Sequence, residues 1–246
     1  MMIRSMMILG GLAVWLPCAQ ADVWVEGTSQ PYERITISSP VEEIVESVEV
    51  EEGDVVEKGS VLAKLFSTRE KLEVKRLGHM IVKAEEDART ARELFEKKIK
   101  SRSNLLEMEA ELKRLQVELE MAQYSVDQRV VKAPVSGTVV YRLKDPGEAI
   151  GRVEPLFEII NASKMKLVFF LSTKHLSILK EGMEVAVVFP ELPAVGEQKA
   201  KLMFVDPQLD SRSGLFRVRF ELDNQTLKAK PGLRVKVKLP ETENGK

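Results

Sequence analysis

The chain has 246 residues, of which 44% are hydrophobic and 30% are charged, the ordinary composition of a folded protein. Its net charge is -1 at pH 7 and only 6% of its residues are aromatic, which excludes a basic, aromatic-rich surface for nucleic acid. The single cysteine, Cys18, excludes a disulfide within the chain, so packing alone has to hold the fold together.

Residues 1–21 have the features of a secretory signal peptide. Arg4 precedes an apolar run, Met6 to Leu16, that is too short to span a bilayer comfortably. A small-x-small sequence ends at Ala21, so cleavage after this residue is expected. Two alternatives stay open: lipidation of Cys18, and retention of the segment as a membrane anchor.

Residues 22–38 are expected to form an N-terminal lead-in strand, because their end alternates polar and apolar residues. After it, one strand-like pattern occurs twice at a constant offset: Pro40 corresponds to Pro134, Gly53 to Gly147 and Leu62 to Leu156. Neither copy can bury its apolar face alone. The two halves, residues 39–67 and 129–161, are therefore predicted to pack as one small β-domain, and the segment between them must leave and return at nearly the same point.

The intervening segment, residues 68–128, contains no proline, and its apolar residues recur at alternating intervals of three and four. This heptad pattern predicts a coiled coil. Its seam consists of Leu77, Ile81, Ala84, Ala88, Ala91 and Phe95 on the first arm, and of Leu105, Met108, Leu112, Leu115, Leu119, Ala122 and Val126 on the second. A break at residues 98–103 makes the two arms an antiparallel hairpin, with Ser103 or Asn104 as the expected cap of the second helix.

Residues 162–240 contain several short alternating stretches separated by glycine and proline, such as Phe216 to Leu222 and Leu233 to Leu239. Short strands with regular turn signals predict a small β-barrel domain. Residues 241–246 are left as a tail.

Together these features resemble the periplasmic adaptor family, the HlyD-like membrane fusion proteins of tripartite efflux and secretion systems. The resemblance rests on the order of the elements and on three motifs: a re-entry strand at Val131 to Val140, and barrel signatures at Val205 to Ser213 and Leu227 to Leu233. It implies an elongated α+β fold. In this fold a split biotinyl/lipoyl-like β-sandwich carries an inserted antiparallel coiled-coil hairpin and is followed by a small β-barrel domain.

The resemblance also implies a non-catalytic function without a cofactor. The chain is expected in the periplasm, associated with the inner membrane, as a ring-shaped homo-oligomer. Its expected partners are an outer-membrane channel protein and an inner-membrane efflux transporter, for which the resistance-nodulation-division (RND) type is expected and an ATP-driven or other type stays open. Because only Glu241 to Lys246 follow the barrel, the chain resembles a short adaptor, and the transporter contact is expected to fall mainly on the barrel.

The family docks its channel through a hairpin-tip pattern: an Arg, a Leu four residues later and a Ser seven beyond that. Leu94 and Ser101 fit this spacing, whereas the Arg position falls on Thr90, next to Arg89. The expected docking residues are Arg89, Leu94, Lys97, Lys98, Ile99, Lys100 and Ser101. The lysines could attract an acidic channel mouth, or they could simply stabilise a helix C-terminus.

Two other functions stay open from the residues alone. A biotinyl/lipoyl fold suits a carrier with a modified lysine, although Met165-Lys166-Leu167 falls in a later alternating stretch and is expected to be strand. The coiled coil could also be a scaffold for another partner in the cell envelope. No nucleophile–base set, phosphate loop or metal-ligand spacing stands out, so neither catalysis nor a metal site is expected.

Overall fold

The computed structural model describes residues 23–226 and 229–240. The expected signal peptide, the tail at residues 241–246 and two residues of one barrel signature, Leu227 and Lys228, lie outside the described residues. The chain forms two compact units. One consists of Gln30–Met165 with Asp223–Pro231, and the other of Lys166–Leu222 with the described parts of Met1–Ser29 and Gly232–Lys246. Strands β1 (Val23–Ser38) and β8 (Pro155–Ser172) contribute several residues to each unit, and β11 (Leu215–Asp223) contributes its last residue to the first.

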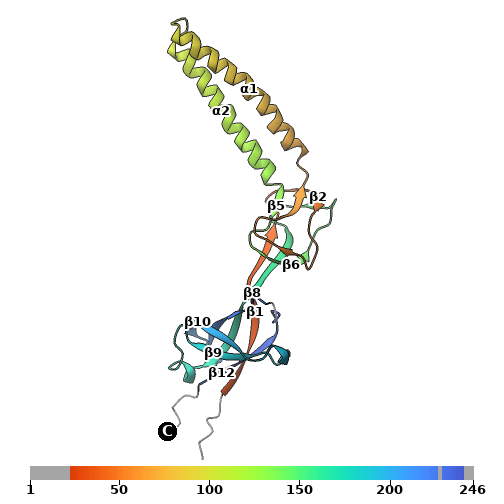
Figure 1. The fold of residues 1–246 in the computed structure, drawn as a ribbon, viewed down its shortest axis with the longest axis vertical. Helices are drawn as coiled ribbons and strands as arrows, with labels where there is room; N and C mark the ends of the chain where they lie inside the picture. The colour runs from red at the N-terminus through yellow and green to blue at the C-terminus, as the bar shows by residue number, and fades with distance from the viewer. Residues whose placement is uncertain (1–22, 227–228, 241–246) are drawn as a thin grey trace, which may run out of the picture. The chain divides into compact units, whose positions relative to one another are not determined.

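The first unit contains a small β-sandwich built from both halves of the sequence repeat (Figure 1). One sheet has the strand order β5-β4-β2-β7, and β6 pairs with both β3 and β8. The first half supplies β2 (Glu43–Val48), β3 (Val55–Val56) and β4 (Val61–Leu65), and the second half supplies β5 (Val130–Lys132), β6 (Gly137–Arg142), β7 (Ala149–Ile150) and the start of β8. Each set of paired strands therefore contains strands of both halves.

The repeated turns exchange matched hydrogen bonds between the halves. The Gly53 amide donates to the Val139 carbonyl and the Gly147 amide donates to the Val45 carbonyl, both at 2.8 Å. Apolar side chains of both halves form one buried core, which includes Val45, Leu62, Leu65, Val139, Ile150, Leu156, Phe157 and Ile159. The prediction of a split β-sandwich is confirmed.

The backbone of Val153 is strained, as comparison with its counterpart in the other half of the repeat shows. Its φ is 66°, in the left-handed region, and the corresponding residue of the first half is Gly59, with a φ of 93°. A β-branched side chain is unfavourable in this region, whereas glycine adopts it freely. The Val153 side chain is 73% exposed, so its removal loses little packing.

We expect Val153→Gly to raise the free energy of unfolding by about 1 kcal/mol, because relief of backbone strain outweighs the extra flexibility of the unfolded chain. Chemical denaturation of the purified protein measures this difference. The reverse change, Gly59→Val, should lower the free energy of unfolding. If both variants were as stable as the parent protein, the backbone at Val153 would not be strained.

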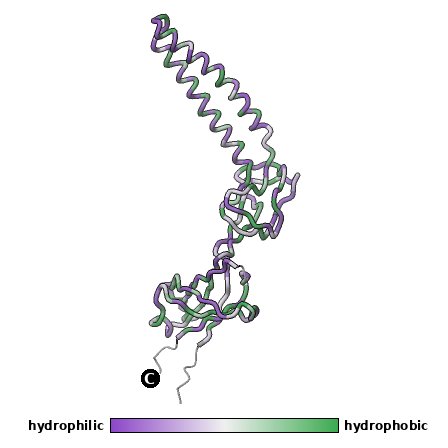
Figure 2. Tube along the Cα trace, in the orientation of Figure 1, coloured by the Kyte–Doolittle hydropathy of each residue, from purple (hydrophilic) through white to green (hydrophobic). Residues whose placement is uncertain are grey.

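Helices α1 (Thr68–Glu96) and α2 (Arg102–Asp127) lie between the two halves and pack as an antiparallel pair (Figure 1). The predicted seam is confirmed: the buried residues of α1 are Leu77, Ile81, Ala84, Ala88 and Ala91. On α2, Leu115 is buried and the other seam residues are half-buried. Figure 2 shows apolar positions recurring along both helices between hydrophilic ones. Phe95, the last seam residue of α1, is 37% exposed because the helices end there.

No helix within the described ranges is long and apolar enough to cross a membrane.

The second unit is a β-barrel with the strand order β1-β12-β9-β10-β11-β8, in which β1 also pairs with β8. Its remaining strands are β9 (Glu184–Val188), β10 (Gln198–Leu209), β11 (Leu215–Asp223) and β12 (Arg234–Leu239), and short 3₁₀ helices lie at Thr173–His175 and Pro193–Val195. The rings of Phe169 and Phe220 meet edge to face inside it, with centroids 5.6 Å apart. Alternation of apolar and polar residues along these strands thus produces a buried interior, as predicted.

Candidate functional site

Helix α1 ends in a tight turn that leads directly into α2. Lys98 has a φ of 57°, in the left-handed region. The Ile99 amide donates to the Leu94 carbonyl at 2.8 Å, and the Lys98 amide donates to the Phe95 carbonyl at 2.9 Å. These two bonds form the Schellman arrangement, which satisfies the last carbonyls of a helix. The position of Ile99 is therefore set by hydrogen bonds and not by a flexible loop.

Ser101 caps the start of α2. Its backbone is extended (φ -75°, ψ 157°), and its Oγ accepts a hydrogen bond from the Asn104 amide at 3.2 Å. The expectation that Ser103 or Asn104 would be the cap was wrong. The Schellman turn is shorter than the sequence break suggested, so the second helix starts earlier than predicted. Asn104 therefore donates its backbone amide to the cap, and its side chain is not the capping oxygen.

The turn brings together six of the seven residues expected to dock a channel. They are Leu94, Lys97, Lys98, Ile99, Lys100 and Ser101. Leu94 is half-buried, the three lysines are exposed, and the Ile99 side chain is 67% exposed. Arg89 lies apart from this group on the shaft of the hairpin (residues 68–93 and 105–127), where its guanidinium pairs with Glu86.

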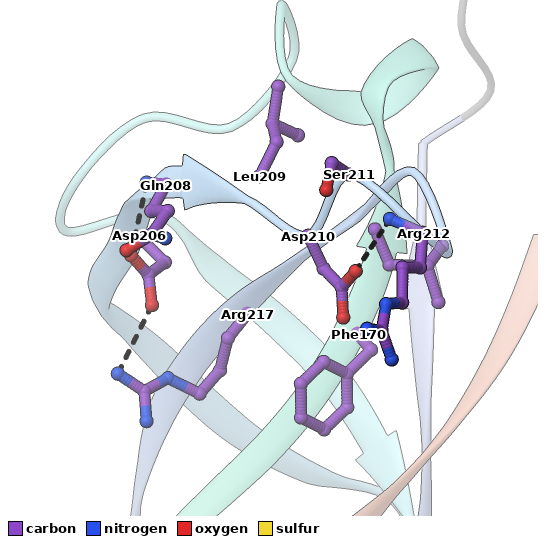
Figure 3. Close-up of a pocket in the computed structure, with 9 residues that line it drawn as sticks. Phe170, Asp206, Gln208, Leu209, Asp210, Ser211, Arg212 and Arg217 are labelled. Carbon is purple, nitrogen blue, oxygen red and sulfur yellow. Dashed lines mark hydrogen bonds and ion pairs between the residues drawn. The ribbon is translucent and has the colours of Figure 1, made fainter.

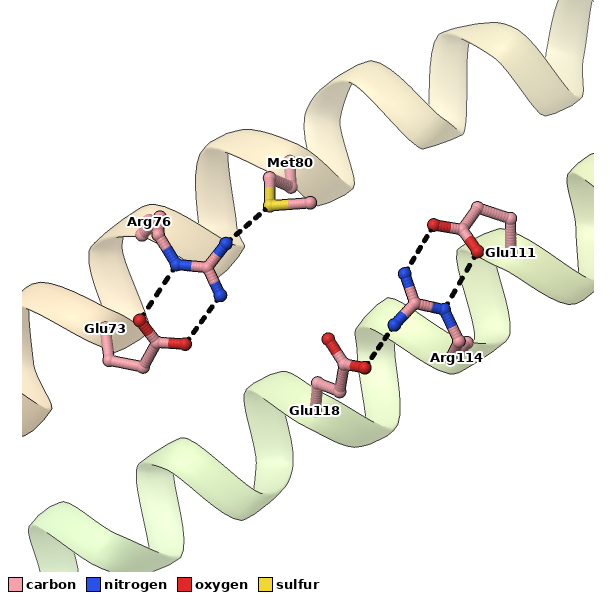
Figure 4. Close-up of polar contacts among 6 residues, drawn as sticks. All are labelled: Glu73, Arg76, Met80, Glu111, Arg114 and Glu118. Atoms are coloured by element: carbon pink, nitrogen blue, oxygen red, sulfur yellow. Dashed lines mark hydrogen bonds and ion pairs between the residues drawn. The ribbon is translucent and has the colours of Figure 1, made fainter.

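Several arginines on the shaft form ion pairs with neighbouring glutamates (Figure 4). Arg76 pairs with Glu73 at 2.6 Å, and Arg114 lies between Glu111 and Glu118. Hydrogen bonds from these guanidinium groups lower the pKa of Glu73 and of Glu111 below its ordinary value. The shaft cations in these networks are thus already satisfied within the hairpin.

The turn differs from the shaft in its charge. The ion pair nearest to it joins Arg92 of α1 to Glu109 of α2. After Glu96, the last residue of α1, residues 97–102 contain three lysines and Arg102 but no acidic residue. None of these four cations has an acidic partner among the described residues. We use the name tip for Leu94, Phe95 and residues 97–102.

Arg129 fastens the base of the hairpin to the sandwich. Its side chain is 13% exposed, and its Nη2 lies 2.8 Å from Glu70 of α1 while its Nε lies 3.7 Å from Glu43 of β2. Its Nη1 also donates to the Ser125 carbonyl of α2 at 2.8 Å. Sequence reasoning missed this residue, because its partners are far apart along the chain and an arginine after a helix is an ordinary feature.

The barrel has an open hollow of about 590 Å³ beside the turn between β10 and β11 (Figure 3). Phe170 lines it and is 58% exposed. Its two carboxylates are already engaged: Asp206 pairs with Arg217 at 3.1 Å, and Asp210 accepts from the Arg212 amide at 2.8 Å. The guanidinium of Arg212 and the ring of Phe170 are left facing the hollow.

Positions relevant to the other expected functions are structural. Lys166 lies in β8 between Met165 and Leu167, both completely buried. This is a barrel strand, as predicted, and not the exposed turn between the halves that a carrier lysine needs.

Burial lowers the pKa of His175, whose Nδ1 lies 3.4 Å from the Ser172 hydroxyl. Across residues 23–226 and 229–240, no group of three or more His, Cys, Asp or Glu is placed to hold a metal ion.

Two families of known proteins match the chain in succession. Residues 33–161 match the CzcB-like, barrel-sandwich hybrid domain, and residues 171–243 match the CusB-like, beta-barrel domain. The chain is 26% identical to nodulation protein NolF of Rhizobium meliloti in an alignment of 226 residues, and the match covers 83% of this chain and 59% of NolF. The chain thus spans less than two thirds of the length of that relative.

Solved structures share the fold. A MacA–MexA chimeric protein, which contains the Pseudomonas aeruginosa MexA alpha-hairpin domain, superposes with a TM-score of 0.79 at 16% identity, over 90% of this chain and 81% of that one. The membrane fusion protein Spr0693 from Streptococcus pneumoniae superposes with a TM-score of 0.69 at 16% identity, over 89% of this chain and all 100% of that one.

The barrel-sandwich match covers more than half of the 246 residues, and it includes both halves of the repeat and the hairpin between them. The barrel match follows in the order that the sequence motifs predicted. The chain therefore belongs to the CzcB-like barrel-sandwich hybrid family of membrane fusion proteins, the HlyD-like adaptors of tripartite efflux and secretion systems.

Proposed function

We propose that this chain is a periplasmic adaptor that bridges an inner-membrane efflux transporter of the RND type and an outer-membrane channel. It couples export across the cell envelope without catalysing a reaction. The observation that carries the proposal is the hairpin: two helices of 29 and 26 residues project one small turn in which residues 97–102 hold four cations and no acidic residue. On the shaft, by contrast, acidic residues are interspersed with the cations, and four arginines pair with glutamates. Such a turn suits contact with another protein.

The tip docks the channel in this proposal, and Leu94 and Ser101 match the family's docking pattern. Thr90 replaces the Arg of that pattern, and the neighbouring Arg89 is already paired with Glu86. Attraction to the channel therefore depends on the lysines of the turn and not on Arg89. The solved structure of EmrA, a relative of the same fold, is described as that of a periplasmic adaptor protein, which supports the location.

The barrel contacts the transporter in this proposal. The hollow beside Phe170 presents an exposed aromatic ring and an arginine without a carboxylate partner among the described residues. Aromatic residues and arginine are the side chains that most often dominate binding energy at protein interfaces. Copies of the chain form a ring, and the signal peptide is removed after Ala21.

The docking role is tested with the double variant Leu94→Glu/Ser101→Glu. We expect the yield of the outer-membrane channel recovered with the tagged, cross-linked adaptor to fall by more than about tenfold, because two carboxylates enter the contact and repel an acidic partner. Mass spectrometry of the purified complex measures the channel and the transporter together. The transporter yield should not change.

The matched control is Val82→Glu, since Val82 is an exposed apolar residue of the shaft, with 61% of its side chain in solvent. This variant should retain both partners, and circular dichroism should show folded helices in all three proteins. An undiminished channel yield with the folded double variant would remove the docking role. Loss of both partners in the control would assign the effect to the hairpin as a whole.

A further inference from the structure

The most exposed apolar side chain of the tip is Ile99. It is 67% exposed although it stands in a rigid turn, and its position is fixed by two amides, those of Ile99 and Lys100, which both donate to the Leu94 carbonyl at 2.8 and 3.3 Å. Phe95, four residues earlier in the sequence, adds a side chain that is 37% exposed. A preorganised apolar residue loses little conformational entropy when it is buried by a partner.

Cations surround Ile99 in the sequence of the turn. Lys97 and Lys98 precede it, Lys100 follows, and Arg102 begins α2. All four are exposed and have no acidic partner among the described residues, and residues 97–102 contain no Asp or Glu to offset them. Charges left unpaired in this way interact most favourably with carboxylates supplied from outside the chain.

Lys98 supports the same conclusion. It stands in the left-handed position of a Schellman turn, where glycine is the usual residue because it has no side chain to clash. A residue that breaks a local structural rule is expected where function benefits from it. Here the benefit is an additional positive charge beside Ile99.

We infer that the tip is a preformed knob, with Ile99 as its apolar anchor and the four cations as its rim, and that it fits an apolar hollow rimmed by carboxylates on the channel protein. This inference rests on the proposed docking function and names the chemistry of the partner surface. Ser101 is a positioning residue: its Oγ holds the Asn104 amide and thereby fixes the start of α2 relative to Ile99.

An anionic lipid surface is the competing partner for a basic, apolar tip. Segments that lie in a membrane interface present a wide apolar face along several helical turns. The tip offers one exposed isoleucine and a partly exposed Phe95, held in a fixed turn. A shaped pocket on a protein uses this rigidity, whereas a fluid surface gains nothing from it.

The anchor is tested by measuring the affinity of the full-length adaptor for the purified outer-membrane channel of the same cell in nanodiscs. Ile99→Asp should weaken binding by at least about 30-fold, as truncation of a central anchor does, and Ile99→Leu should stay within about threefold. Val82→Asp, which places the same charge on an exposed apolar position of the shaft, should bind like the parent protein.

The rim is tested with the triple variant Lys97→Gln/Lys98→Gln/Lys100→Gln. Its association rate should fall by about tenfold at low salt, and its dependence on salt should become weaker, because charge steers the encounter. The control changes three exposed lysines of the shaft, Lys71, Lys75 and Lys83, to glutamine. It removes the same net charge and should change the rate by less than about twofold if position matters.

The positioning role is tested at Ser101. Ser101→Ala loses the cap and should weaken binding by about fivefold, whereas Ser101→Asn keeps a neutral capping oxygen and should bind within about twofold of the parent protein. If the serine hydroxyl instead contacts the channel directly, asparagine will weaken binding as much as alanine. That result would overturn the positioning role.

The outcomes separate this inference from the proposed function. If the parent protein does not bind the channel, both fall. If it binds and Ile99→Asp and the lysine triple variant bind equally well, docking stands and the knob is overturned. Vesicles of phosphatidylglycerol and phosphatidylethanolamine form the second arm. Binding to vesicles that Ile99→Asp abolishes, together with unchanged channel binding, would assign the tip to the membrane and overturn the inference.

Discussion

Replacing Gly137 by alanine should lower the free energy of unfolding by at least about 3 kcal/mol, because the added methyl group meets the backbone of a neighbouring strand. Gly137 begins β6 and pairs with Val56 of β3. A Cβ at this position would lie 2.3 Å from the Ile160 carbonyl oxygen and 2.9 Å from Cγ2 of Ile159. The oxygen belongs to the backbone of β8, so relief requires separating two paired strands.

The matched control is Gly78→Ala, in the middle of α1, where nothing lies within 4 Å of the added Cβ. There the same methyl group should raise the free energy of unfolding of the hairpin by about 1 kcal/mol, because glycine is a poor helix former. Urea denaturation followed by circular dichroism measures both variants. If the two substitutions shift the denaturation midpoint in the same direction, the close approach of β8 to Gly137 does not make the sandwich sensitive to an added methyl group.

Phe169→Ala should destabilise the barrel by about 4 kcal/mol, whereas the neighbouring change Phe170→Ala should cost less than about 1 kcal/mol. The Phe169 side chain is completely buried, and its ring meets that of Phe220 at an interplanar angle of 87°. It also packs directly on β1, since a Cβ on Gly27 would lie 2.4 Å from its Cδ1 atom. Removing the ring leaves a cavity that these rigid strands cannot close.

Phe170 points the other way along the same strand and lines the open hollow, so its removal creates no internal cavity. Tryptophan fluorescence during denaturation follows the barrel through Trp24 of β1. Similar losses for both variants would mean that the alternation along β8 does not separate inside from outside. If the proposed transporter contact is correct, Phe170→Ala will reduce recovery of the transporter while leaving the barrel stable.

The repeated half-motif and the heptads were sufficient to predict most of the fold. Apolar residues recur every two residues in these strands and about every 3.5 residues in the coiled coil. This spacing is a local property of the sequence, and it predicts which face of each element is buried. The constant offset that relates Gly53 to Gly147, and the rest of the first half to the second, added a long-range restraint. Two halves with the same apolar pattern can bury their apolar faces against each other. The matched 2.8 Å hydrogen bonds of these two turns are its structural counterpart.

The tip was predicted only in part. Its lysines, Ile99 and Ser101 could be named from the sequence, but the cap was misplaced, since no rule of composition predicts that a lysine rather than a glycine takes the left-handed position of the turn. Whether a charge is paired also depends on neighbours across the hairpin. Arg92 forms an ion pair with Glu109 on the other helix, whereas Lys98 has no acidic partner within the described residues.

The order of the elements, the split of the sandwich and the seam of the coiled coil can all be derived from the amino-acid pattern, because each depends on periodic burial along one stretch of chain. Contacts between distant stretches are visible only in the folded chain: Arg129 with Glu43 and Glu70, the hollow beside Phe170, and the Gly137 contact with β8. These contacts depend on the exact register and distance between elements. Periodicity does not encode that register, since one pattern is compatible with several neighbouring alignments.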